Sequence, residues 1–160
     1  MSDAETLQAL LDSSWARAGA AARAAWSAPS RMTAAEVGRF LARERYCAIA
    51  TGSPEGEPHL VPVSFVFLDD GSFWLPAVDG SARLRDISAH PRAALLVGQG
   101  VGADHQLVIA RGPVEIRATA TLPAVVRRRS QEKLGDTTWA GSWLVLRPDR
   151  LIAYAAAAAG

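Results

Sequence analysis

The sequence predicts a mainly β domain, an antiparallel β-barrel of six or seven strands with helices packed against its outside. Short apolar runs, several with alternating apolar and polar positions, recur over residues 46–117 and 142–155. Turn sequences such as Ser53-Pro54-Glu55-Gly56 and Asp69-Asp70-Gly71 separate consecutive runs. The order, lengths and turn spacing of these runs favour antiparallel strands that close on themselves.

Composition narrows the class of protein. With 160 residues, of which 49% are apolar, the chain is long enough to bury a core of its own. A formal net charge of +1 lacks the basic excess of nucleic-acid binders, so we expect no nucleic-acid partner. Cys47, the single cysteine, lies in an apolar run and reads as a buried, inert thiol. Charged residues interrupt the N-terminal segment, so we expect a cytoplasmic protein without membrane contact.

The N-terminal segment is expected to be helical. We predict a helical extension over residues 1–30, with one helix over residues 3–26, followed by the barrel domain over residues 31–156. An apolar stripe at helical spacing supports this helix and comprises Leu7, Leu11, Trp15, Ala18, Ala22 and Trp26. Pro29 ends it. The stripe is expected to cover either the barrel or a second subunit.

The remaining elements follow from local signals. Thr33-Ala34-Ala35-Glu36 is a capping box that opens a helix with Val37, Phe40 and Leu41 on its buried side. Strands are expected over residues 46–51, 58–68, 72–77, 92–97, 106–117, 142–146 and 151–155. Helices are expected over residues 81–89 and 121–134, and Pro91 halts the first of these.

The predicted strand over residues 58–68 is unusual because it has apolar residues on both sides, which indicates a barrel strand covered twice. Pro62 cannot donate to a strand ladder, so it is expected where pairing is broken or open. Such a stretch suits a flat ligand, and an ordinary edge strand is the alternative.

The helix that follows Asp79-Gly80-Ser81 carries the strongest functional signal. It places the hydroxyl of Ser81 and the guanidinium of Arg83 in its first turn. Together with the free N–H groups at a helix start, these groups suit a phosphate. The alternative for Arg83 is an ordinary surface cation. The glycines of residues 98–102 open no helix, so they are not a dinucleotide fingerprint.

These pieces, in this order, resemble the pyridoxamine 5'-phosphate oxidase-like, FMN-binding split-barrel superfamily. The resemblance covers roughly residues 33–154 and includes Gly56-Glu57-Pro58-His59, Val61-Pro62-Val63 and His90-Pro91-Arg92. It implies an antiparallel split β-barrel, and a homodimer that binds a flavin or deazaflavin between its protomers.

The resemblance also implies cofactor-binding residues. Arg83 stands where the family usually has a lysine, and Ser81 matches a hydroxyl two residues earlier. Val61, Pro62, Val63 and Ser64 match the strand beside the flavin ring and ribityl chain. The remaining implied residues are His59, Ala77, Gln106 and Trp139. True pyridoxamine phosphate oxidases have an arginine where this chain has His59, and an arginine–histidine substrate motif where it reads Arg147-Pro148-Asp149-Arg150. Pyridoxine biosynthesis is therefore not expected.

The resulting hypothesis is an oxidoreductase of the flavin/deazaflavin branch, with FMN as cofactor, coenzyme F420 as the alternative and heme as a weaker one. The substrate is a small molecule that the sequence does not identify. A flavin performs its own redox chemistry, so we expect no catalytic side chain. We expect no metal site either, because the three histidines are scattered. The competing hypothesis is a non-catalytic flavin- or heme-binding protein. The run Arg127–Arg129 is either a solvated helix face or a guide for anions, and Trp139 and Trp143 either stack on a ring or pack an interface.

Overall fold

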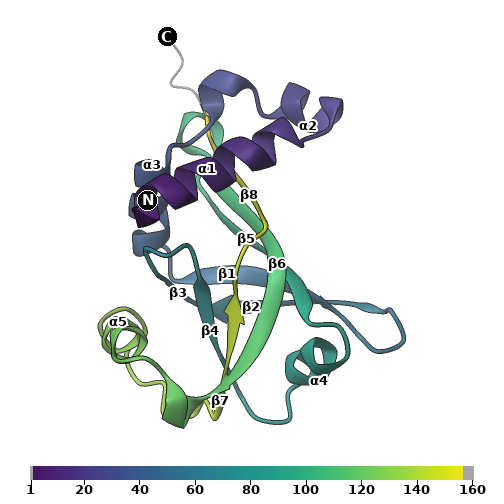
Figure 1. Cartoon of the computed structure of the whole chain (residues 1–160), viewed down its shortest axis with the longest axis vertical. Helices are drawn as coiled ribbons and strands as arrows, with labels where there is room; N and C mark the ends of the chain where they lie inside the picture. The colour runs from purple at the N-terminus through teal and green to yellow at the C-terminus, as the bar shows by residue number, and fades with distance from the viewer. Residues whose placement is uncertain (1, 157–160) are drawn as a thin grey trace.

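The computed structural model describes residues 2–156, which form a curled antiparallel sheet with helices around it (Figure 1). The α-helices are α1 (Asp3–Ala16), α2 (Ala20–Ala25), α3 (Ala34–Arg43), α4 (Ala82–Ala89) and α5 (Ala124–Leu134). Single 3₁₀ turns cover Ala28–Ser30, Gly102–Asp104 and Thr119–Thr121. The strands are β1 (Tyr46–Gly52), β2 (Pro58–Ser64), β3 (Val66–Phe67), β4 (Phe73–Ala77), β5 (Arg92–Gln99), β6 (Gln106–Ala118), β7 (Ser142–Leu146) and β8 (Arg150–Ala155).

The sheet is a split barrel. Its strand order is β2-β1-β5-β6-β7-β4-β3, and β8 pairs with β6 beside this path. The long strand β6 pairs with β5 and β8 along its first part and with β7 along its last part, which lets the sheet curl. The two strands at the ends of the path, β2 and β3, follow each other directly in the chain. The predicted fold class is therefore confirmed, with eight strands in the described part of the chain where six or seven were expected.

The prediction of one strand over residues 58–68 is wrong in one respect, because Phe65 divides it. β2 pairs with β1, whereas β3 pairs with β4. The amide of Phe65 donates to the carbonyl of Arg45 at 3.2 Å, and its ring is fully buried. Alternation of apolar residues continues through this position, so the break is visible only in the pairing. Pro62 lies on β2, an end strand of the sheet, where a missing N–H is tolerated.

The prediction of one helix over residues 3–26 is also wrong, since α1 and α2 are separated by residues 17–19. Gly19, a poor helix former, precedes the first residue of α2. The carbonyl of Arg17 accepts a hydrogen bond from Arg150 at 3.3 Å. Of the predicted stripe only Leu7 and Leu11 are buried, and they pack into the core of the barrel. This places α1 against its own chain, beside β8.

The helices cover the two ends of the barrel differently. In Figure 1, α1, α2 and α3 gather at one end, while α4 and α5 flank the other. One apolar cluster fills the barrel and extends under α1 and α3. A second cluster lies under α5 and includes Val126 and Trp143. Trp143 is fully buried within the chain, so neither of its expected roles applies. The capping box of α3 is confirmed, because the Thr33 hydroxyl accepts from the amide of Glu36.

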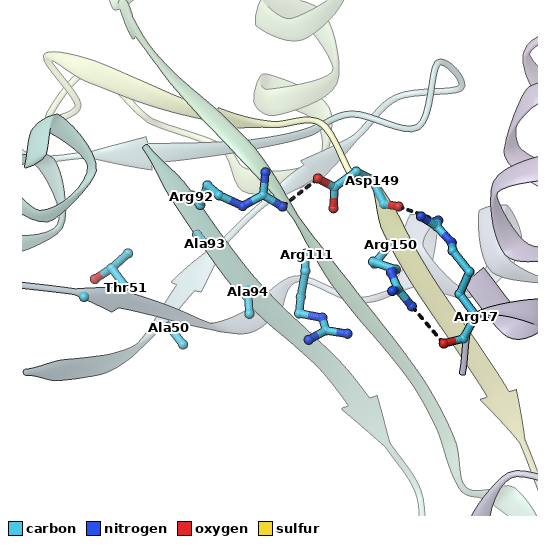
Figure 2. A pocket seen from close by; sticks show the side chains of 10 residues that line it. Arg17, Ala50, Thr51, Arg92, Ala93, Ala94, Arg111, Asp149 and Arg150 are labelled. Carbon is cyan, nitrogen blue, oxygen red and sulfur yellow. Dashed lines mark hydrogen bonds and ion pairs between the residues drawn. The ribbon is translucent and has the colours of Figure 1, made fainter. Parts of the chain in front are cut away.

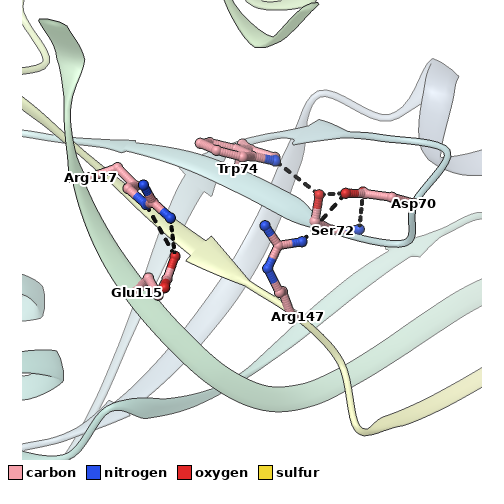
Figure 3. Close-up of polar contacts among 6 residues, drawn as sticks. All are labelled: Asp70, Ser72, Trp74, Glu115, Arg117 and Arg147. Carbon is pink, nitrogen blue, oxygen red and sulfur yellow. Dashed lines mark hydrogen bonds and ion pairs between the residues drawn. The ribbon is translucent and has the colours of Figure 1, made fainter. Parts of the chain in front are cut away.

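The turn between β3 and β4 is held by a polar network (Figure 3). Asp70 accepts a hydrogen bond from the amide of Ser72 at 2.9 Å, and Trp74 donates its ring N–H to the Ser72 hydroxyl at 2.9 Å. Gly71 has a positive φ of 82°, which glycine adopts without strain. Arg147 reaches Asp70 from the end of β7 at 3.4 Å. The predicted hairpin is thus tied to the neighbouring strand.

Among residues 2–156, no helix is both long and apolar enough to cross a membrane. Cys47 is buried, as predicted. Burial raises the pKa of its thiol to about 12, so the thiol stays protonated and unreactive near neutral pH.

Candidate functional site

A hollow of about 350 Å³ opens where the start of β1 meets the end of β2. The register of these strands sets Tyr46 opposite Ser64. α4 contributes Arg83 to the hollow, and the loop after α5 contributes Trp139. Half of the residues that the sequence assigned to the cofactor line it together: Pro62, Val63, Ser64, Arg83 and Trp139.

The loop that carries Trp139 is fixed to the barrel. Arg45 donates to the carbonyl of Leu134, the last residue of α5, at 2.7 Å. Gly135 then turns the chain with a positive φ of 78°. The ring N–H of Trp139 donates to the carbonyl of Asp136 at 3.1 Å, and half of this residue remains exposed. An aromatic surface therefore stands at the mouth of the hollow with its polar atom already satisfied.

The start of α4 holds polar atoms that have no hydrogen-bond partner among residues 2–156. Ser81 occupies the N-cap position, yet its hydroxyl caps no amide, and this buried oxygen has no partner in that part of the chain. Nε of Arg83 is likewise buried without a partner among the described residues, and its Nη2 donates weakly to the carbonyl of Pro76 at 3.3 Å. Leaving a buried donor unpaired costs about 1–3 kcal/mol.

Burial lowers the pKa of Arg83, because desolvation disfavours its charge. Within residues 2–156 no carboxylate forms an ion pair with it. A half-buried cation, an idle hydroxyl and the free amides of a helix start are complementary to an anionic oxygen. The residues present therefore fit a phosphate group.

The loop that leads into α4 is held in place by Asp79. This carboxylate accepts a hydrogen bond from the hydroxyl of Ser142, at the start of β7, at 2.7 Å. Gly141 permits the approach, because a Cβ at that position would overlap the Asp79 carboxylate. The Ser81 hydroxyl and the Arg83 guanidinium, the groups that fit a phosphate, are thus positioned against the sheet.

The other predicted cofactor residues lie elsewhere. Ala77 is fully buried at the end of β4, and Val61 packs against the barrel core. Gln106 accepts a hydrogen bond from Arg43 at 3.2 Å and lines a different hollow. Ser81 precedes α4 without lining the hollow itself. His59 lies at the opposite end of β2 from Ser64.

His59 belongs to a separate network under α4. Its Nδ1 lies 2.8 Å from Oδ2 of Asp86, and the hydroxyl of Thr51 donates to the same oxygen at 2.6 Å. Only 2% of the Asp86 side chain is exposed. Desolvation would raise the pKa of this carboxyl, but the hydrogen bonds from Thr51 and His59 outweigh it and the pKa is lowered. Asp86 therefore remains ionised and orients the imidazole.

The sequence interpretation missed Arg45 and Tyr46. Both line the hollow, and the Arg45 guanidinium carbon lies 5.8 Å from the centre of the Tyr46 ring. Tyr46 is 61% exposed on a strand whose next residue is buried, and alternation with Cys47 was the available signal.

In the Arg127–Arg129 run, Arg129 pairs with Asp69 at 2.7 Å. Arg128 is exposed.

Comparison with known proteins shows which family shares this part of the chain. The family model described as "Pyridoxamine 5'-phosphate oxidase" matches residues 33–157. No match was found among curated proteins.

Solved structures with the same fold differ widely in sequence. A conserved hypothetical protein from Mycobacterium tuberculosis has a TM-score of 0.68 at 20% identity, covering 81% of this chain and 89% of its own. HutZ, the heme storage protein from Vibrio cholerae, has a TM-score of 0.61 at 15% identity, covering 73% and 91%. An F420 reductase has a TM-score of 0.57 at 22% identity, covering 71% and 93%.

Proposed function

The chain belongs to the pyridoxamine 5'-phosphate oxidase family, and we propose that it is an oxidoreductase that binds FMN, with coenzyme F420 as the alternative, and acts on a small molecule. The observation that carries the proposal is the pair of unpartnered buried atoms on Ser81 and Arg83, beside a hollow of about 350 Å³. Membership of a family that includes flavin enzymes and the unpartnered polar groups of Ser81 and Arg83 both support this proposal.

In this proposal the chain's own residues bind and orient the cofactor. Arg83 and Ser81 hold the phosphate, with the first amides of α4. The end strand β2 lines the ring through Pro62 and Ser64, and Trp139 covers the mouth of the hollow. When bound, a flavin or deazaflavin supplies the hydride or electron transfer itself. The protein excludes water and fixes the approach of the substrate.

We also propose that the protein is a homodimer with the cofactor sites at its interface. The outward side of the sheet carries a row of apolar residues in direct register across five strands: Pro62, Ala48, Leu96, Ile109 and Ile152. Leu60 and Leu96 on this side are 70% and 44% exposed. We call this surface the apolar face. It reaches the hollow at Tyr46 and Pro62, so a second copy covering it would also border the cofactor.

Heme binding without catalysis is the second candidate, because HutZ shares the fold and is a heme storage protein. Histidine, cysteine and methionine, the more common side-chain ligands of heme iron, are absent from the described lining of the 350 Å³ hollow, and Tyr46 is the one described lining residue of a type that ligates heme iron. The flavin proposal is therefore preferred.

Reconstitution with each cofactor tests the proposal. Purified protein is titrated separately with FMN, coenzyme F420 and hemin, and binding is followed by absorbance and by the thermal unfolding temperature. We expect saturable binding of FMN or F420 at micromolar concentration, with a raised unfolding temperature. A Soret band with hemin, and no response to either flavin, would overturn the oxidoreductase proposal.

A further inference from the structure

A second hollow, with four arginines among its ten lining residues, lies at the other end of β1 (Figure 2). Its volume is about 590 Å³, larger than that of the candidate cofactor site. Arginines from four separate elements or their ends meet around it: Arg17 after α1, Arg92 on β5, Arg111 on β6 and Arg150 on β8. We call it the arginine hollow. Residues so far apart in the chain come together here only through the fold.

Most of these side chains are held in place. Arg17 donates to the carbonyl of Asp149 at 3.0 Å, and Arg150 donates to the carbonyl of Arg17 at 3.3 Å. Arg92 pairs with the carboxylate of Asp149 at 2.6 Å. These contacts to backbone and to one carboxylate tie the ends of α1, β5 and β8 together and fix the rim of the hollow.

Positively charged side chains outnumber negatively charged ones in the lining of the arginine hollow. Asp149 is the single carboxylate among the residues that line the hollow, against four guanidinium groups. Arg111 stands between Arg92 and Arg150 (Figure 2), and its guanidinium makes no hydrogen bond or ion pair with the described part of the chain, although its backbone pairs with both neighbouring strands. A concave surface of one sign concentrates ions of the opposite sign, and a guanidinium without a partner offers two parallel donors to an oxyanion.

The floor of the arginine hollow leaves room for a ligand. Ala50, Ala94, Arg111 and Arg150 lie in direct register across β1, β5, β6 and β8. The small side chains of the two alanines leave space beside the two arginines. This row is adjacent to the apolar face and, along β1, lies about 13 Å from Tyr46 at 3.3 Å per residue. The hollow is therefore a site separate from Arg83.

We propose that the arginine hollow binds a small polyanion, one whose clustered phosphate or carboxylate oxygens pair with Arg111 and Arg150. Such a ligand neutralises the unpaired charge of Arg111. The neighbouring arginine side chains are already held in place, so binding costs little side-chain conformational entropy. The proposal does not depend on which cofactor occupies the other hollow.

Isothermal titration with pyrophosphate and with citrate tests this proposal, at a constant ionic strength of about 0.15 M. We expect saturable binding of at least one of them, and comparison of the two distinguishes phosphate from carboxylate chemistry. Arg111→Ala should weaken this binding by about tenfold, the loss of one charge-assisted pair at a partly exposed site. Asp149→Asn should tighten it, because the competing carboxylate is gone.

Two matched variants locate the binding. Arg128→Ala removes an exposed arginine on α5 and should leave the affinity unchanged. Arg83→Ala should leave the Arg111-dependent binding unchanged, which separates this site from the candidate cofactor site. The proposal is overturned if neither anion binds saturably, if Arg111→Ala and Arg128→Ala bind equally well, or if Arg83→Ala abolishes the binding.

Discussion

Asp86 shows how a single buried carboxylate organises its surroundings. It accepts one hydrogen bond from Thr51 and lies within hydrogen-bonding distance of His59, and these two contacts tie β1 and β2 to α4. Those bonds favour the ionised form, so the pKa of Asp86 is lower in the folded state than in the unfolded chain. Between these two values the unfolded chain binds more protons, and stability falls as the pH falls.

We predict that Asp86→Asn lowers the free energy of unfolding by about 1–3 kcal/mol at pH 7, the cost of disrupting a buried charge-assisted hydrogen bond. The difference from the parent should shrink below about pH 3.9, where the carboxyl becomes protonated in the unfolded chain and then in the folded one. Urea unfolding between pH 7 and pH 3 measures this. Asp104→Asn, at an exposed position, is the control. A gap that stays constant with pH would show that the charge of Asp86 is not responsible.

Among the elements, α5 is joined to the rest of the domain by a partly buried cation, Lys133. Nζ of Lys133 lies 3.9 Å from the centre of the Phe65 ring and donates to the carbonyl of Leu41 at 2.8 Å. Desolvation lowers its pKa to about 8. The lysine thus joins α5 to α3 at the point where Phe65 divides the barrel strand.

The pH dependence of this contact has a definite sign. Above pH 8 the folded protein has begun to lose the Lys133 proton, while the unfolded chain keeps it until about pH 10.4. The unfolded chain then binds more protons, so the contribution of Lys133 to stability rises with pH over this window. We predict that Lys133→Met, which keeps the apolar stem, flattens the rise in stability measured by urea unfolding at pH 7, 8.5 and 10. An equal rise in parent and variant would exclude Lys133 as its source.

The elements also show which structural features a sequence can predict. The α3 capping box, the hairpin turn at Asp69-Asp70-Gly71 and the start of α4 rest on local chemistry, and all were predicted correctly. The break at Phe65 and the gap between α1 and α2 depend on distant partners, Arg45 and Arg150 respectively. The same holds for the candidate site. The helix start that carries Ser81 and Arg83 could be predicted from local sequence, and the binding role of these two residues stays a prediction. Arg45 and Tyr46 join the hollow only through strand register and the loop after α5.

At the scale of the whole molecule, the apolar face determines the proposed assembly. We predict that the parent sediments as a dimer and that Leu96→Asp, at the centre of the face, sediments as a monomer, because a buried unpaired carboxylate is costly. Val101→Asp is the control, since Val101 is 85% exposed in a loop outside the face. Analytical ultracentrifugation at micromolar concentration decides between the outcomes. A monomeric parent, or a dimeric Leu96→Asp variant, would contradict this assembly.

The central claim is that Arg83 and Ser81 hold the phosphate of a flavin-type cofactor, and titration of Arg83→Ala tests it most directly. Affinities for FMN and for coenzyme F420 are compared in the parent, Arg83→Ala, Arg83→Lys and the exposed control Arg85→Ala. We predict that Arg83→Ala binds about ten- to a hundredfold more weakly, the loss of a charge-assisted hydrogen bond. Lysine should restore part of the affinity because it keeps the charge without the fork, and Arg85→Ala should bind like the parent. Equal affinity of the parent and Arg83→Ala for both cofactors would contradict the claim.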